Sequence, residues 1–333
     1  MVRIFHELRR DYLGIVRDLL ASGLRGADIS IFHDFYRPPY GGGNQFLLAL
    51  RGEFVRRGIR VANNTISNTT RACLFNSFNF DFDRLRRLRR EGCRMIHRVD
   101  GPIGSYRGED DGTDQRIHAI NQELADMTVF QSRYSLETHQ ALGLEFAMPV
   151  VIMNAVDPMI FHSENRRWES SGRKIRLIST SWSSNPNKGG AVYRWLDQHL
   201  DWDRFEYTFV GHSESAFQHI RLVAPVASRE LATLLRQHDI YIAASRHDPC
   251  SNALLEALAC GLPAIYAQSG GHPEIVGKAG FGFSSPESIP FLLDRLISEY
   301  EGRRQEIAIP TLEYVTNQYL SVMGFVHDVS AMA

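Results

Sequence analysis

Short apolar runs alternate along this chain with longer segments in which apolar residues recur at helical spacing. Runs rich in β-branched and aromatic residues predict buried strands, for example at residues 27–33 and 239–244. Segments such as residues 46–57 and 252–260 predict helices. This alternation occurs twice, on either side of a polar stretch at residues 162–174. The pattern predicts an α/β protein with two Rossmann-like domains that face a central cleft, divided near residue 160.

The second strand–helix series contains a loop that leads into a short, well-capped helix. Ser251 or Asn252 can cap this helix, because a short polar side chain accepts a hydrogen bond from an orphan N–H group. The backbone N–H groups from Ser251 to Ala253, together with the helix dipole, suit a phosphate group. Two carboxylates bracket this phosphate site, Asp248 in the loop and Glu256 in the helix, with seven residues between them.

From Asp248 to Pro263 the chain reads D-P-C-S-N-A-L-L-E-A-L-A-C-G-L-P, and G-G-H-P-E follows from Gly270 to Glu274. This sequence resembles the acid-x7-acid signature of retaining glycosyltransferases of the family-4 type, also called group 1, which have the GT-B fold. The resemblance implies an enzyme that moves a sugar from a nucleotide-diphosphate sugar to an acceptor, retains the anomeric configuration and needs no metal or other cofactor. It implies that Asp248 holds the sugar hydroxyls and that Glu256 holds the ribose.

The same resemblance assigns a role to each predicted domain. Residues 1–160 would be the acceptor domain, with an extra N-terminal helix at residues 1–25. Residues 161–333 would be the nucleotide-sugar domain, and its last helix, at about residues 312–327, would cross back to the first domain. The acceptor would be a carbohydrate or a lipid-linked molecule. A role in polysaccharide, lipopolysaccharide or glycoconjugate synthesis follows only by analogy with the family.

A glycine-rich loop after the first strand of the second domain contains Lys188 and Gly189. In the resembled family an Arg and a Lys of this loop contact the donor diphosphate. Lys188 matches the Lys, whereas Ser183 stands where the Arg is expected. The resemblance therefore makes Lys188 a catalytic residue that stabilises the leaving diphosphate. We also expect Arg246 to bind the donor, together with Gly211 at the end of the next strand.

In the first domain, Gly42, Gly43 and Asn44 lie between the first predicted strand and the helix that follows it. A glycine run between strand and helix lets the backbone approach a ligand closely. In the resembled family this loop faces the donor phosphate and the acceptor. We therefore expect Gly42 and Gly43 to bind the donor and Asn44 to lie on the acceptor side, with a flexible turn as the alternative.

Three polar residues, His97, Arg98 and Asp100, come at the end of the strand predicted at residues 94–102. Open α/β sheets place ligand groups at this end of their strands. We therefore expect His97 and Arg98 on the acceptor side. By resemblance, Asp100 occupies the place of a polar residue that faces the sugar, so it is a catalytic candidate. The alternative is that Asp100 only starts the turn before Gly101.

Composition limits the range of partners. The formal net charge of -1 gives no support for nucleic-acid binding. The four cysteines lack metal-site spacing and indicate reduced thiols, which favours the cytoplasm. An arginine-rich helix predicted at residues 81–90, or the helix at residues 1–25, could contact anionic lipid. The sequence therefore leaves open whether the protein lies peripherally on the inner face of the membrane.

Two other functions are also open from the sequence. One is a non-hydrolysing sugar-nucleotide epimerase, which would share the fold. The other is a degenerate GT-B protein that binds a sugar nucleotide without turnover. The short Asp248 side chain, where the family usually has Glu, and the Ser183 in place of an Arg keep this last possibility open.

Overall fold

The computed structural model describes residues 26–36, 41–108, 111–164, 172–183, 185–213 and 216–325. These residues form two compact units. Unit 1 contains the described residues up to Met153 and those from Leu312 onward, and unit 2 runs from Asn154 to Thr311. The units therefore divide between residues 153 and 154, somewhat before the predicted boundary near 160. The helix predicted at residues 1–25 lies outside the described residues.

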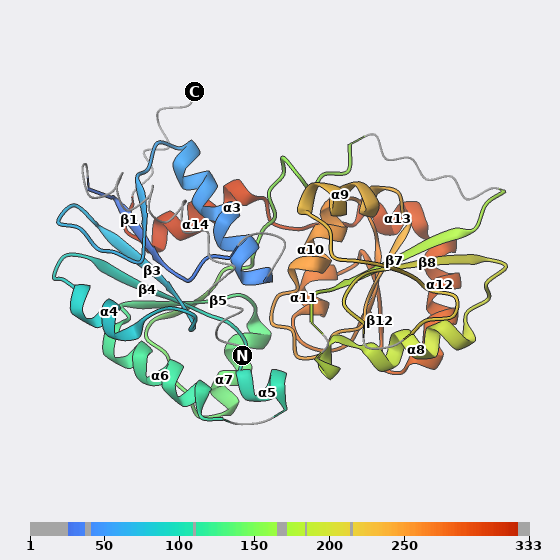
Figure 1. Cartoon of the computed structure of the whole chain (residues 1–333), viewed down its shortest axis with the longest axis horizontal. Helices are drawn as coiled ribbons and strands as arrows, with labels where there is room; N and C mark the ends of the chain where they lie inside the picture. Colours follow the sequence, from blue (N-terminus) through green and yellow to red (C-terminus); the bar gives the residue numbers. More distant parts are fainter. Residues whose placement is uncertain are drawn as a thin grey trace. The chain divides into compact units, whose positions relative to one another are not determined.

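Unit 1 is built on a six-stranded parallel sheet with the strand order β2-β1-β3-β4-β5-β6 (Figure 1). The order reverses between β1 and β3, which are neighbours although β2 lies between them in the sequence. In open parallel sheets such a reversal is where ligands bind, outside the carboxyl ends of the strands. The strands are β1 (Ile29–Phe32), β2 (Val61–Asn63), β3 (Ala72–Asn76), β4 (Arg94–Val99), β5 (Met127–Phe130) and β6 (Pro149–Val151).

Helices cover both faces of this sheet (Figure 1). One face carries α3 (Gly42–Arg56) and α14 (Leu312–Val322), which pack against each other through the rings of Phe46 and Tyr319, 5.8 Å apart. The last described helix thus belongs to unit 1, although its sequence follows unit 2. The other face carries α4 (Phe82–Leu88), α5 (Ile103–Arg107), α6 (Thr113–Leu124) and α7 (Arg133–Ala141).

Unit 2 is a second six-stranded parallel sheet, with the strand order β12-β11-β10-β7-β8-β9. Its order reverses between β7 and β10, which pair directly. Counted within the unit, this is the Rossmann order 3-2-1-4-5-6, so the loops after β7 and β10 flank the expected ligand position. The strands are β7 (Ile175–Ser181), β8 (Phe205–Gly211), β9 (Arg221–Val223), β10 (Ile240–Ala243), β11 (Ala264–Ala267) and β12 (Gly280–Phe283).

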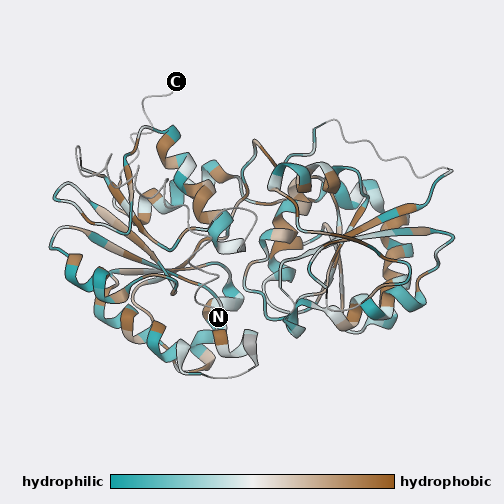
Figure 2. Ribbon diagram, in the orientation of Figure 1, coloured by the Kyte–Doolittle hydropathy of each residue, from teal (hydrophilic) through white to brown (hydrophobic). Residues whose placement is uncertain are grey.

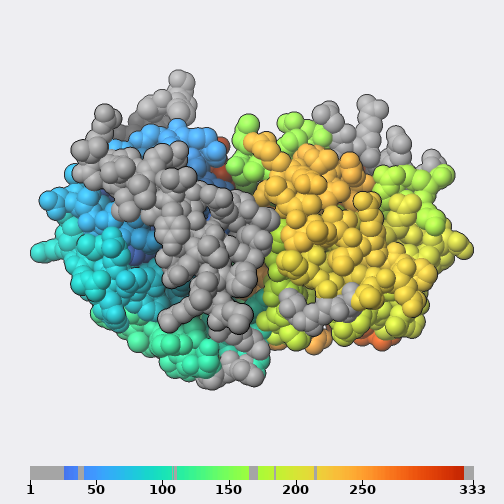
Figure 3. Space-filling model, viewed as in Figure 1, coloured from blue at the N-terminus to red at the C-terminus, as the bar shows by residue number. Residues whose placement is uncertain are grey.

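The helices of unit 2 also form two layers (Figure 1). On one side of the sheet lie α8 (Gly190–His199), α12 (Ile289–Ser298) and α13 (Tyr300–Gln305), whose apolar residues share a core with β8. On the other lie α9 (Ser228–Arg236), α10 (Asn252–Ala259) and α11 (His272–Val276). The central strands are mainly apolar, while the helices combine apolar and polar residues (Figure 2). Figure 3 shows the described residues of unit 2 in space-filling form, coloured from yellow-green to orange along the sequence.

The arginine-rich helix predicted at residues 81–90 is shorter in the structure, where α4 covers residues 82–88. The Asp81 carboxylate caps its N-terminus. Several of its guanidinium groups are bonded within unit 1. Arg86 donates to both carboxylate oxygens of Glu123, and Arg84 donates to the carbonyl oxygen of Asn64. These bonds occupy groups that a lipid contact would use, so that contact stays a prediction. None of the helices in the described ranges has the length and apolar character needed to cross a membrane.

Candidate active site

The loop after β10 and the start of α10 form the centre of the candidate site in unit 2. Ser251 is the N-cap of α10, and its hydroxyl oxygen accepts a hydrogen bond from the backbone N–H of Leu254 at 3.4 Å. Ser251 therefore takes the capping role that the sequence left open between Ser251 and Asn252. The Asn252 side chain instead accepts a hydrogen bond from Asn154. Within the described ranges no acceptor bonds to the backbone N–H of Asn252 or Ala253, so both remain available to an anion.

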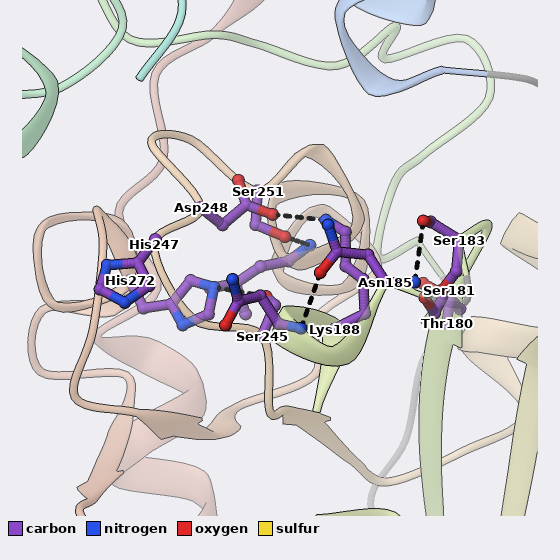
Figure 4. A network of polar contacts seen from close by, with 12 residues as sticks. Thr180, Ser181, Ser183, Asn185, Lys188, Ser245, His247, Asp248, Ser251 and His272 are labelled. Carbon is purple, nitrogen blue, oxygen red and sulfur yellow. Dashed lines mark hydrogen bonds and ion pairs between the residues drawn. The ribbon is translucent and has the colours of Figure 1, made fainter. Parts of the chain in front are cut away.

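Lys188 and Asp248 form an ion pair at the point where the strand order reverses. Lys188 ends a short 3-10 helix, Pro186–Lys188, that follows β7, and Asp248 lies in the loop after β10. The Lys188 Nζ atom is 3.0 Å from Asp248 Oδ2. Figure 4 shows the two side chains pointing toward each other from their separate loops. The structure thus brings together the two residues that the sequence assigned to the diphosphate and to the sugar.

Asp248 is only 8% exposed, and its surroundings keep it charged. Burial alone would raise its pKa, but the charge of Lys188, its hydrogen bond and the backbone N–H of Cys250 hold the pKa below its ordinary value. A buried carboxylate that stays ionised next to a lysine is suited to accept hydrogen bonds from hydroxyl groups.

The glycine-rich loop after β11 packs directly on the backbone of Asp248. Gly270 has φ +65°, and a Cβ atom there would overlap the carbonyl oxygen of Asp248. The backbone N–H of Gly271 donates to that same carbonyl oxygen at 2.9 Å. On the other side, Gly189 has φ +86°, and a Cβ atom there would lie 2.5 Å from the carbonyl oxygen of Ala244. These glycines allow three loops to meet around Asp248.

Glu256 lies on α10 and is 9% exposed. In the described part of the chain its carboxyl group has no hydrogen-bond or ionic partner. Burial raises its pKa to about 8, so this carboxyl group is largely protonated at neutral pH. Leaving a buried carboxyl group without a partner costs stability, which favours a role in binding over a role in folding.

Other predicted donor residues have mixed positions. The Ser183 hydroxyl accepts a hydrogen bond from the backbone N–H of Asn185 at 3.1 Å, so it shapes the loop before Lys188. Gly211 is required for packing, since a Cβ atom there would overlap the carbonyl oxygen of Ser181. The Arg246 side chain is exposed, while its backbone N–H donates to the carbonyl oxygen of Asn187. A cavity of about 180 Å³ adjoins this loop and is lined by Ser183, Asn185, Lys188, Arg194, His212 and others.

His272 is a member of this site that the sequence did not single out. It is fully buried at the start of α11, with Nε2 3.1 Å from the Ser245 hydroxyl and Nδ1 3.2 Å from the carbonyl oxygen of Ala267. Burial lowers its pKa, although the charge of Asp248 acts in the opposite direction. No motif identifies His272, because it is a single residue whose role depends on loops that only the fold brings together.

In unit 1, Asp100 lies just after β4 and is held by several partners. Its carboxylate lies 3.0 Å from Arg98 Nη1 and also accepts a hydrogen bond from the Gln131 side chain. Its backbone N–H donates to the Ser77 hydroxyl at 2.6 Å. The Asp100 side chain remains 28% exposed, so it can still meet a ligand. Arg98, by contrast, is completely buried, where it also donates to Asn76 at 2.7 Å. Arg98 therefore supports the Asp100 carboxylate, and its contact with the acceptor stays a prediction.

Two other residues expected on the acceptor side, His97 and Asn44, are buried within unit 1. His97 is completely buried, stacked on Phe75 at 4.4 Å and bonded to Asn121, so its contact with an acceptor stays a prediction. Asn44 is also buried, and its side-chain amide both accepts from the N–H and donates to the carbonyl oxygen of Tyr36. Successive strand residues face opposite sides of a sheet, which explains why His97 and its neighbour Arg98 have such different surroundings.

Gly42 and Gly43 are the first two residues of α3, not part of the preceding loop. They can offer backbone N–H groups at a helix start, as Asn252 and Ala253 do in unit 2. Gly43 also lies close to Arg98, because a Cβ atom built on it would be 3.9 Å from Nη1. Among the residues that the structure describes, no group of three or more His, Cys, Asp or Glu side chains is arranged to hold a metal ion.

Comparison with known protein families connects unit 2 to sugar transfer. Residues 196–299, just under a third of the chain, match the family model described as glycosyl transferases group 1. The match includes Asp248, Glu256 and His272 but begins after Lys188. Spore coat protein SA of Bacillus subtilis is 28% identical over 102 residues, which are 28% of this chain. The matched region spans only 27% of that relative's length.

Comparison with solved structures defines the fold of the whole chain. HepE of Anabaena, solved in complex with UDP-glucose, has a TM-score of 0.65 at 13% identity, over 90% of this chain and 100% of that one. The catalytic domain of starch synthase IV from Arabidopsis thaliana, bound to ADP and acarbose, has a TM-score of 0.65 at 11% identity, over 89% and 98%. Sucrose-phosphate synthase from Thermosynechococcus elongatus has a TM-score of 0.60 at 12% identity, over 93% and 91%. The fold is therefore GT-B, as the sequence predicted.

Proposed function

We propose that this protein is a retaining glycosyltransferase that moves a sugar from a nucleotide-diphosphate sugar to a carbohydrate or lipid-linked acceptor. The observation that carries the proposal is the Lys188–Asp248 ion pair at the strand reversal of unit 2, together with the partnerless carboxyl group of Glu256 on α10 of the same unit. A cation can bind the diphosphate, a charged carboxylate can bind the sugar hydroxyls, and a protonated carboxyl group can bind the ribose.

The donor would extend along the loops at the carboxyl ends of β7 and β10. Its phosphates would bind the backbone N–H groups of Asn252 and Ala253 and the Lys188 ammonium. Its ribose would exchange hydrogen bonds with Glu256, and its sugar hydroxyls would donate to Asp248. Support comes from two solved structures of the same fold, because HepE was solved with UDP-glucose and starch synthase IV with ADP.

Catalysis would rest on charge that develops in the transition state. The bond between the anomeric carbon and the diphosphate oxygen breaks, which leaves negative charge on the diphosphate. Lys188 would turn from Asp248 toward that charge and stabilise it. Retention implies that the acceptor hydroxyl attacks from the side of the leaving group and passes its proton to a diphosphate oxygen. We therefore assign no protein nucleophile, and Lys188 takes the place of a metal.

The acceptor would be bound by unit 1, with Asp100 as the residue that meets its hydroxyl groups. Arg98 and Gln131 fix the Asp100 carboxylate, while the carboxylate itself stays partly exposed. Gly42 and Gly43 add backbone N–H groups at the start of α3. We place the reaction in polysaccharide, lipopolysaccharide or glycoconjugate synthesis in the cytoplasm, with the acceptor at the inner face of the membrane where it is lipid-linked.

The experiment that tests this proposal is incubation of the full chain with UDP-, ADP- and GDP-sugars in the presence of EDTA. Slow hydrolysis of one donor, with release of nucleoside diphosphate, supports a metal-independent transferase. Interconversion of the sugar on the nucleotide would instead identify an epimerase. Binding of a nucleotide sugar without any turnover would identify a degenerate protein, and loss of activity in EDTA would contradict metal independence.

A further inference from the structure

His272 connects two loops of the candidate site from inside the protein. Its Nδ1 atom faces the carbonyl oxygen of Ala267, which can only accept, so Nδ1 carries the proton. Its Nε2 atom then accepts a hydrogen bond from the Ser245 hydroxyl. Ala267 ends β11, and Ser245 lies three residues before Asp248. One neutral imidazole thus joins the end of one strand to the loop that carries Asp248 (Figure 4).

Backbone contacts hold the same loop at two further points. The backbone N–H of His247 donates to the Ser269 hydroxyl at 3.1 Å, and the carbonyl oxygen of Asp248 accepts from Gly271 at 2.9 Å. His247 itself has φ +56°, in the left-handed region that few residues other than glycine adopt. A loop with such a residue holds its shape only where its surroundings fix it. The bond between Ser245 and His272 fixes the side of the loop that leads into this strained residue.

The imidazole also lies beside the charges of the site. The charge of Asp248 raises the pKa of His272 and the charge of Lys188 lowers it, while burial, the largest influence, keeps the ring neutral. A neutral His272 therefore leaves Lys188 as the cationic partner of Asp248. If Lys188 turns to a diphosphate, as the proposed function requires, Asp248 keeps its position only through its loop.

We propose that His272 is a positioning residue, which holds the Asp248 loop through Ser245 and Ala267 while Lys188 moves from Asp248 to the leaving diphosphate. This inference rests on the proposed function. It does not make His272 a catalytic residue, because the ring is fully buried and cannot reach a substrate.

The test is a double-mutant cycle of Ser245→Ala and His272→Asn. Each change removes the same hydrogen bond from one end, and the Asn side chain can still donate to Ala267. We expect each single variant to lower kcat for nucleoside diphosphate release about tenfold, since a misplacement of about 1 Å can cost up to about a hundredfold. We expect kcat of the double variant to lie within about twofold of kcat of either single variant. The Kd of UDP should change by less than about twofold, because Lys188 and Glu256 remain.

Unit 2 offers a matched control at the opposite end of its sheet. His238 makes the same pair of bonds, with Nδ1 2.6 Å from the carbonyl oxygen of Leu234 and Nε2 2.9 Å from the Thr208 hydroxyl. Thr208→Ala and His238→Asn should lower the thermal midpoint as much as the test variants do, yet leave kcat within about twofold of the wild type.

The outcomes separate this inference from the proposed function. If the wild type releases nucleoside diphosphate from none of the sugar nucleotides, the proposed function is overturned and this inference with it. If the wild type is active, but the test variants keep its kcat or their effects multiply, this inference alone is overturned. An equal loss of kcat in the control variants would also overturn it, because a general loss of stability would then explain the result.

Discussion

The Nζ atom of Lys188 lies 3.0 Å from Oδ2 of Asp248, although 60 residues separate the two in the sequence. The proposed mechanism assigns Lys188 to the diphosphate and Asp248 to the sugar of the same donor. The donor must therefore separate the pair, and its own negative charge replaces that of Asp248 next to the lysine. This exchange links donor binding to the electrostatics of the site.

Replacing Lys188 with Ala should reduce turnover more than it weakens donor binding. The charge on the diphosphate grows as the bond to the sugar breaks, so the lysine contributes most in the transition state. We expect kcat to fall by roughly 10²–10³, the usual effect of removing such a group. Lys278→Ala is the control, because Lys278 lies on an exposed surface of unit 2. An unchanged kcat in Lys188→Ala would show that another cation stabilises the leaving group.

Replacing Glu256 with Gln should change the pH dependence of stability. The pKa of Glu256 is about 8 in the folded protein and ordinarily 4.5, so the folded state binds more protons between these values. The free energy of unfolding should therefore fall as pH rises through this window. Glu256→Gln removes the titrating group, so its melting temperature should fall less between pH 6 and 9 than that of the wild type. Glu306→Gln, at an exposed position, should keep the wild-type slope.

The same Glu256→Gln variant should bind UDP more weakly. Loss of a hydrogen-bonding carboxyl group from the ribose should cost about 1–3 kcal/mol of binding free energy, measurable by calorimetry. If the variant is more stable than the wild type at alkaline pH but binds UDP more weakly, Glu256 serves binding rather than folding. Equal affinity in the variant and the wild type would refute the ribose assignment.

Replacing Gly270 with Ala should destabilise the protein and impair turnover. Gly270 has φ +65°, and a Cβ atom there would overlap the carbonyl oxygen of Asp248. We expect the free energy of unfolding, from urea denaturation, to fall by about 1–3 kcal/mol. Gly302→Ala is the matched control, because Gly302 lies in α13 and a Cβ atom there meets nothing within 4 Å. Equal stability of the two variants would mean that the loop after β11 does not press on Asp248.

Replacing His97 with Phe should make unit 1 less sensitive to acid. Burial lowers the pKa of His97 to about 3 from an ordinary value of 6.5, so the unfolded chain binds the proton first. The free energy of unfolding should therefore fall as pH drops below about 6.5. A Phe ring can keep the stacking on Phe75 without titrating. Thermal unfolding at pH 7 and pH 5 should show a smaller loss in the variant, whereas an equal loss would contradict the burial of a neutral His97.

The sequence predicted much of unit 2, because its signals there are local. A cap at Ser251 or Asn252 and the spacing of Asp248 and Glu256 define a loop and helix without any knowledge of the fold, and the structure selects Ser251 as the cap. The strands β9 and β12 were not predicted. β9 has three residues and β12 reads G-F-G-F, so neither has the β-branched run that indicates a strand.

Unit 1 was harder to predict for a related reason. The central strand β3 reads A-C-L-F-N, which has no β-branched residue, so it was not predicted. The start of α3 at Gly42 was also missed, since glycine is a poor helix former and indicates a loop. Which side of a strand His97 faces, and the contact of Lys188 with Asp248, depend on strand order. Strand order is a property of the whole chain, which local patterns do not contain.

The most direct measurement is nucleoside diphosphate release by the wild type and by Asp248→Asn, at saturating sugar nucleotide, together with the Kd of UDP. We predict that the wild type turns over one donor and that kcat of the variant falls at least about tenfold. The Kd of UDP should be unchanged or lower in the variant, because Lys188 no longer has a carboxylate that competes with the diphosphate. A wild type that releases no nucleoside diphosphate, or a variant with the wild-type rate, would contradict sugar transfer at the Lys188–Asp248 pair.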